Sequence, residues 1–243
     1  MKDSYHQSGY IYLKNIFSEE ELQHLESILT RFHKTWLQAN DSQYKSGAIN
    51  SHSITSSKWI SNEERLAIFK FISQKKISDI VSDIFPRKAV FLNTQLFFDP
   101  LSKRQNNYWH RDIQYTEMNM EQQKESILTQ NVLHFRIPFR SEPGIELVPG
   151  THRKWDTPQE LETRLSMNGR TPCDDLDTGI KVPLNRGDLL IFSANMIHRG
   201  LYGNNRFTLD IIFCDDSPEF RKFIDIRNHP QPEELPFLNT SLF

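Results

Sequence analysis

A histidine and an aspartate lie two positions apart in the stretch Trp109-His110-Arg111-Asp112. In an extended segment, residues i and i+2 project to the same side, so His110 and Asp112 can point together. An imidazole and a carboxylate, joined by a second histidine from elsewhere, form the two-histidine, one-carboxylate facial triad that binds ferrous iron. A His-x-Asp pair by itself is a weak signal, because a hydrogen-bonded surface pair is commoner than a ligand pair. The interpretation therefore depends on what the rest of the chain supplies.

A second stretch, residues 186–200, supplies the missing histidine. It predicts a turn, then an apolar core strand, then His198, which would lie at the mouth of a barrel. Arg206 follows eight residues later and opens another predicted strand, with Thr208 on the same face. A guanidinium binds a carboxylate through two parallel hydrogen bonds, and a neighbouring hydroxyl can add a third. An isolated arginine is more often solvated or salt-bridged, but the combination favours a metal site beside a carboxylate anchor.

Other polar residues share strand faces with this constellation. Asn93 and Gln95 lie on one face of a predicted strand, and either could bind a carboxylate group of a cofactor. Polar residues on a half-solvated face are an equally good explanation for this pair. Weaker candidates for contact with a substrate are Trp109, His134 and Arg136. Packing is the commoner role for a tryptophan, and the other two could equally face outward.

Helical patterns occupy the first part of the chain. Ser18-Glu19-Glu20-Glu21 predicts a capping box that starts an amphipathic helix. Two shorter helices are expected around Glu63–Ser73 and Ile77–Phe85. The segment Asn40–Ser61 is polar, serine-rich and aperiodic, so it is expected to be a long loop or a mobile cover.

Strand patterns dominate the second part of the chain. The predicted strands are Ala89–Phe98, Asn131–Phe139, Ile145–Val148, Asp188–Ser193 and Arg206–Cys214. Two peripheral helices, Glu117–Leu128 and Pro158–Ser166, are expected between them. Helices followed by strands predict an α+β fold with a mostly antiparallel barrel or sandwich. No repeat or linker divides the chain, so we expect a single domain over residues 1–243.

Composition restricts the class of protein. The chain has 243 residues, of which 37% are hydrophobic and 12% aromatic, which is typical of a folded globular protein. A formal net charge of −2, from 29 basic and 31 acidic side chains, gives no electrostatic footprint for nucleic acid or an anionic membrane. Two cysteines imply no disulfide framework, and no stretch predicts a secretory signal or a membrane span. We therefore expect a cytoplasmic protein that acts on a small molecule.

Four motifs, taken together and in this order, resemble the phytanoyl-CoA dioxygenase-like (PhyH) family of iron(II)/2-oxoglutarate-dependent oxygenases. They are Trp109-His110-Arg111-Asp112, Gly144-Ile145-Glu146-Leu147-Val148-Pro149-Gly150-Thr151-His152, residues 187–198 and Arg206-Phe207-Thr208. They span roughly Ala89 to Cys214, about half of the chain. One stretch departs from the family pattern. The strand before the Pro149-Gly150 turn has the sequence His134-Phe135-Arg136-Ile137-Pro138-Phe139 where the family has an aromatic and acidic residues.

The resemblance implies a double-stranded β-helix (jelly-roll) core over about residues 89–214, with flanking N-terminal helices. It implies Fe(II), the cosubstrate 2-oxoglutarate and O2, with release of succinate and CO2. Residue by residue, it gives His110, Asp112 and His198 as the catalytic metal ligands. It also gives Arg206 and Thr208 as the residues that bind the distal carboxylate of 2-oxoglutarate. It does not indicate the substrate, and nothing in the chain supports an acyl-CoA.

The sequence is also compatible with other reaction types and with other classes of protein. Related halogenases replace the carboxylate ligand with a small residue, so Asp112 favours hydroxylation, with desaturation or ring closure as alternatives. A non-catalytic jelly-roll protein that binds a metal or small ligand is the main alternative, and Arg206 argues against it. A cupin-type isomerase or hydrolase usually needs a further histidine or carboxylate near the first pair, and none lies there.

Overall fold

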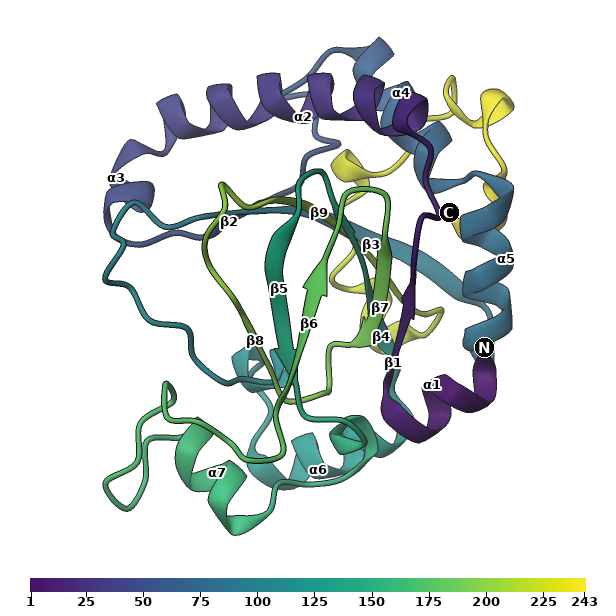
Figure 1. The fold of residues 1–243 in the computed structure, drawn as a ribbon. Helices are drawn as coiled ribbons and strands as arrows, with labels where there is room; N and C mark the ends of the chain where they lie inside the picture. Colours follow the sequence, from purple (N-terminus) through teal and green to yellow (C-terminus); the bar gives the residue numbers. More distant parts are fainter.

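The computed structural model describes residues 1–243 and contains two antiparallel sheets (Figure 1). The large sheet has the strand order β1 (Tyr10–Leu13), β7 (Leu189–Ser193), β4 (Val132–Pro138), β9 (Phe207–Asp215), β3 (Ala89–Phe98) and β2 (Asn50–His52). The small sheet has the order β6 (Ile180–Leu184), β5 (Glu142–Leu147) and β8 (His198–Gly200). The mixed helix-and-strand class expected from the sequence is therefore confirmed.

Helices surround the sheets. They are α1 (Lys2–Ser8), α2 (Glu19–Ala39), α3 (Asp41–Lys45), α4 (Asn62–Ile72), α5 (Lys75–Ile84), α6 (Met120–Thr129), α7 (Pro158–Arg164) and α8 (Pro218–Arg221). The predicted capping box starts α2. The Ser18 hydroxyl accepts the backbone N–H of Glu21, and the Glu21 carboxylate accepts the N–H of Ser18. None of these helices is long and apolar enough to cross a bilayer.

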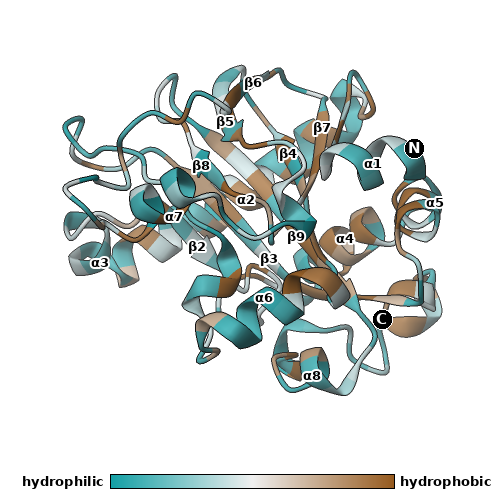
Figure 2. Cartoon of the chain, turned by 90° about the horizontal axis from the view of Figure 1, so that it is seen from below, coloured by the Kyte–Doolittle hydropathy of each residue, from teal (hydrophilic) through white to brown (hydrophobic).

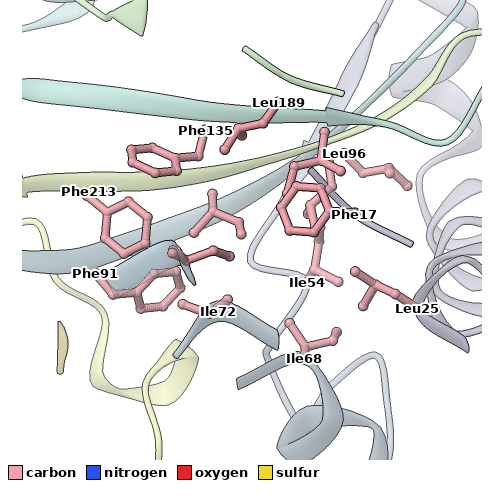
Figure 3. Packing of buried hydrophobic residues seen from close by; sticks show 14 of the residues in the cluster. Phe17, Leu25, Ile54, Ile68, Ile72, Phe91, Leu96, Phe135, Leu189 and Phe213 are labelled. Carbon is pink, nitrogen blue, oxygen red and sulfur yellow. The ribbon is translucent and has the colours of Figure 1, made fainter. Parts of the chain in front are cut away.

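The main hydrophobic core lies between the large sheet and helices α2, α4 and α5. In Figure 3, Phe135 of β4 and Phe213 of β9 lie on the sheet side of this core, and Ile72 of α4 lies on the helix side. The odd-numbered residues of β9, from Phe207 to Phe213, all belong to this core. Because strand side chains alternate, the even-numbered residues of β9 face the other way, toward the small sheet. Figure 2 shows hydrophobic residues concentrated on the central strands and on α4, whereas α1 is largely hydrophilic.

A second, smaller apolar cluster joins the two sheets. Its members are Ile145, Leu147, Val182, Leu184, Leu190, Phe192 and Met196. They come from β5 and β6 of the small sheet and from β7 and the following turn of the large sheet. This cluster thus fills one side of the space between the two sheets.

The segment Asn40–Ser61 differs from the expected structureless loop. It contains α3 and the edge strand β2, in which Ser51 pairs with Leu96 of β3. Ile54 is fully buried in the main core (Figure 3). The expectation of a long loop is wrong, because pairing with β3 gives partners to backbone groups that a local hydrophobic pattern does not reveal.

Candidate metal centre and active site

Three residues converge between the sheets to form a candidate metal centre. His110, Asp112 and His198 each offer one ligand atom, and these atoms lie within 4.8 Å of one another. Asp112 Oδ1 is 3.5 Å from Nε2 of His110 and 3.5 Å from Nε2 of His198. The Asp112 side chain is 36% exposed, so one side of the group is open. The structure therefore brings together the three residues that the sequence predicted as ligands.

Backbone pairing positions the two histidines. His110 and His198 form an isolated antiparallel bridge, with reciprocal N–H to carbonyl hydrogen bonds of 3.0 and 2.9 Å. Asp112 begins a 3-10 turn, and its N–H donates to the carbonyl of Ala194 at 3.0 Å. All three backbones are therefore held by partners distant in sequence.

Hydrogen bonds also set the histidine tautomers. Nδ1 of His110 lies 3.2 Å from the Tyr108 carbonyl, and Nδ1 of His198 lies 2.9 Å from the Met196 carbonyl. A nitrogen that faces a carbonyl donates its proton, which leaves each Nε2 with a lone pair for a metal. Burial, with the neighbouring His110, lowers the pKa of His198 to about 3. His198 is thus the neutral imidazole that metal coordination requires.

A buried series of hydrogen bonds holds Asp112 through Oδ2, the oxygen that is not near His110 and His198. His134 Nε2 lies 2.8 Å from Asp112 Oδ2, and His134 Nδ1 lies 2.9 Å from Asp210 Oδ2. Arg136 in turn binds Asp210 through Nε at 2.8 Å and Nη2 at 2.7 Å. Because Oδ2 of Asp112 is engaged by His134, Oδ1 is the oxygen left for a metal.

The charged groups in this series of hydrogen bonds stabilise one another in their ionised forms. Burial by itself lowers the pKa of His134, but hydrogen bonds to Asp112 and Asp210 outweigh it and raise the pKa to about 9. Burial raises the pKa of Asp112, but the hydrogen bond from His134 and the nearby histidines hold it well below its usual range. His134, which was predicted as a substrate contact, lines the cavity beside the candidate metal centre, and both of its nitrogens are engaged by carboxylates. Asp210 was not among the predicted site residues, although strand alternation from Arg206 and Thr208 placed it on their face, where it pairs with a basic neighbour, Arg136.

Arg111, between the candidate ligands His110 and Asp112, is turned away from them and fully buried. Its guanidinium donates to the carbonyls of Thr151, Lys154 and Asn195. It also pairs with Asp156, with Nη2 2.7 Å from Oδ1. Arg111 thus ties the turn that carries the ligands to the loop after β5. Sequence reasoning missed this role, since only the position of Arg111 between two inward-facing residues hinted at it.

A cavity of about 320 Å³ opens beside the candidate metal centre. It is lined by His110, Asp112, His198, Gln95, Arg136 and Arg206, among other residues. Arg136 lines the cavity, and its Nη1 has no hydrogen-bond partner. The volume suits a small organic acid together with part of a second small molecule.

Arg206 has an unusual environment. Its side chain is fully enclosed, and none of its three nitrogens has a hydrogen-bond partner. A buried guanidinium without an acceptor is costly, so a carboxylate ligand would complete this site. Glu142 Oε1 lies 3.7 Å from Arg206 Nε, and Thr208 donates its hydroxyl hydrogen to Glu142 Oε2.

Three predicted site residues are not in the cavity. Thr208 is fully buried, with its hydroxyl committed to Glu142. Asn93 accepts the backbone N–H of Thr94 at 2.8 Å. Trp109 is fully buried beneath Arg199, and its Nε1 donates to the Asp174 carbonyl.

The sequence model described as phytanoyl-CoA dioxygenase (PhyH) matches residues 5–205. The chain belongs to the PhyH family. The match includes the three converging residues and ends one position before Arg206. A search of curated proteins finds no match to this PhyH-family chain.

Several solved structures share the PhyH-family fold of this chain. EctD from S. alaskensis with bound Fe has 13% identity and a TM-score of 0.60, covering 95% of this chain and 84% of its own. The carbocyclase SnoK from nogalamycin biosynthesis has 14% identity and a TM-score of 0.58, and the match covers 87% of this chain and 81% of the SnoK chain. The epimerase SnoN, in complex with Fe3+, alpha ketoglutarate and nogalamycin RO, has 12% identity and a TM-score of 0.57. The match covers 88% of this chain and 82% of the SnoN chain. At these identities the likeness concerns the fold.

Proposed function

We propose that this chain is an iron(II)- and 2-oxoglutarate-dependent dioxygenase that hydroxylates a small-molecule metabolite and releases succinate and CO2. The observation that carries the proposal is the convergence of His110, Asp112 and His198 on a cavity that also contains Arg206. Family membership supports it, as do the iron in EctD and the iron and alpha ketoglutarate in SnoN. The proposal includes one oxygenase domain over residues 1–243, with a double-stranded β-helix core at about residues 89–214.

The donor set fits ferrous iron. Two neutral imidazoles and one carboxylate oxygen would occupy one face of the ion and leave the opposite face open. Bound iron, with 2-oxoglutarate and O2, supplies the oxidising power for the reaction. His134 restricts Asp112 to one ligand oxygen, which keeps the remaining positions free for small molecules.

The cavity suits 2-oxoglutarate. Arg206, with three unpartnered nitrogens, would bind the distal carboxylate, and Gln95 would donate its amide to the carboxylate nearer the metal. Thr208 could join this anchor only after its hydroxyl leaves Glu142. The carbocyclase SnoK and the epimerase SnoN share the fold, so reaction type is a separate question from the metal site. Hydroxylation is proposed because Asp112 retains the carboxylate ligand.

The proposal is tested by anaerobic titration and by succinate assays over a panel of small metabolites. The protein should bind one ferrous ion, and 2-oxoglutarate should then produce the visible charge-transfer band of an iron(II) chelate. His198→Ala should lose most of the iron, because one ligand is removed. Arg206→Leu should keep the iron but weaken 2-oxoglutarate severely.

Each outcome separates the proposal from its alternative. A non-catalytic binding protein would give the charge-transfer band without forming succinate from any substrate in the panel. If His198→Ala kept the iron affinity of the unmodified protein, the assignment of ligands would be wrong. If Arg206→Leu kept the same midpoint for 2-oxoglutarate, Arg206 would not be the anchor.

A further inference from the structure

Glu142 is a buried carboxylate placed beside the candidate anchor for the distal carboxylate. It lies at the start of β5, on the side of the strand that faces β9, and its side chain is fully enclosed. Its Oε2 accepts the hydroxyl hydrogen of Thr208, and its Oε1 has no hydrogen-bond partner. Oε1 is also the atom that lies 3.7 Å from Nε of Arg206.

The charges around Glu142 balance before any ligand binds. Arg206 is the nearest cation, and it too is fully enclosed. Arg136 of β4 and Asp210 of β9 also act on Glu142, but they form a bidentate ion pair with each other. Tyr202 acts on Arg206 from the loop before β9, and the β6 residue paired with Glu142 is the apolar Leu184. The enclosed region therefore holds one unshared cation and one unshared carboxylate.

A second carboxylate at Arg206 upsets this balance. If Glu142 stayed ionised, two carboxylates would share one guanidinium in a region without solvent, and one negative charge would be buried without a partner. Like charges at such a site raise the pKa of one carboxyl until it takes up a proton. Burial already raises the pKa of Glu142, against the opposing influence of Arg206 and Thr208.

We propose that Glu142 belongs to the distal-carboxylate site and acts there as a neutral carboxyl, so that 2-oxoglutarate binds together with one proton. The inference rests on the proposed function, since it requires Arg206 to bind the cosubstrate. The proton sits on Oε1, the oxygen that lacks a partner and faces Arg206. From there it donates to the incoming carboxylate, while Oε2 continues to accept from Thr208. Glu142 is thus a binding residue that distinguishes 2-oxo diacids from 2-oxo monoacids.

Calorimetry on the unmodified protein tests this directly. Binding of 2-oxoglutarate to the anaerobic iron(II)-loaded protein is measured at about pH 8 in two buffers with different ionisation enthalpies, which gives the number of protons exchanged. We expect close to one proton to be taken up per 2-oxoglutarate. The matched ligand 2-oxobutanoate, which lacks the distal carboxylate, should take up none. Equal proton uptake for the two acids would overturn the proposal.

The pH dependence of affinity gives a second test. Where Glu142 is ionised in the free protein and neutral in the complex, 2-oxoglutarate affinity should fall about tenfold per pH unit as the pH rises. Glu142→Gln keeps the shape and the acceptor for Thr208 but cannot exchange a proton. Its affinity should be independent of pH over the same range and higher than that of the unmodified protein at about pH 8.

The control is Glu160→Gln. Glu160 is also buried, but it serves in the capping box of α7, where glutamine can replace it. This variant should keep the pH slope of the unmodified protein. If Glu142→Gln kept that slope, or bound 2-oxoglutarate more weakly, Glu142 would be only a structural partner of Thr208. If neither 2-oxo acid gave heat or a charge-transfer band at any pH, the proposed function itself would fail, and this inference with it.

Discussion

The hydrogen bond from His134 to Asp112 permits a quantitative test of how the candidate metal centre is supported. We expect His134→Leu to weaken iron(II) binding by about 10- to 100-fold, the usual effect of removing a residue that supports a metal ligand. This corresponds to about 1.4–2.8 kcal/mol. The variant removes the donor that lies 2.8 Å from Asp112 Oδ2, so both carboxylate oxygens become free to rotate. Asp210 keeps its two bonds to Arg136, so this buried carboxylate does not lose its last partner.

The assay is a competition titration of iron(II) against a chromophoric chelator under anaerobic conditions. The matched control is His152→Leu, which replaces another buried histidine with the same residue. Neither ring nitrogen of His152 has a hydrogen-bond partner, and its side chain lies outside the cavity. Iron affinity should therefore be unchanged in the control. The reasoning is refuted if His134→Leu binds iron within a factor of about two of the unmodified protein, or if both variants lose the same affinity.

Two further predictions concern stability. The pKa of His134 is raised from 6.5 to about 9, so its stabilising contribution to the metal-free protein is fully present below about pH 6.5 and is lost as the pH rises through about 9. Denaturant titrations across that range should show a loss of up to about 3 kcal/mol in the free energy of unfolding, and His134→Leu should not show it. Arg111→Met should cost about 3–5 kcal/mol in unfolding free energy, since it removes a fully buried guanidinium that pairs with Asp156 and donates to three buried backbone carbonyls. Arg170→Met, which removes a partly exposed pair with Glu162, should cost less than about 1 kcal/mol, and a larger loss there would contradict the burial argument.

The strands of the large sheet were predictable where their own side chains carry the pattern. β9 has apolar residues at every second position facing the main core, and its structural limits lie within one residue of the prediction. The short strands β1, β2, β6 and β8 were not predicted. β8 has only three residues, and its extended form depends on pairing with β5. Such pairing is a long-range property that no local window contains.

The convergence of the three proposed metal ligands was predictable for a similar reason. His110 and Asp112 are neighbours in sequence, and His198 follows a strongly apolar strand. The support behind Asp112 was not predictable, because Asp112 and His134 lie on different elements, 22 positions apart in sequence. Glu142 was missed because the turn-forming Pro143-Gly144 suggested that the strand began later. In the structure the strand continues through Gly144, which has a φ of +81° and leaves no room for a Cβ beside Val182.

The backbone bridge between His110 and His198 fixes the distance between these two residues, whatever the length of the chain that connects them. Each donates to the carbonyl of the other, so their separation is set by two hydrogen bonds and not by the helices α6 and α7 and the strands β4 to β7 that intervene in sequence. Outer loops such as residues 165–170, whose hydrogen bonds are local, can therefore change in length or sequence without moving one histidine relative to the other. A scaffold built this way allows its outer segments to diverge toward new small molecules while the inner pair stays constant.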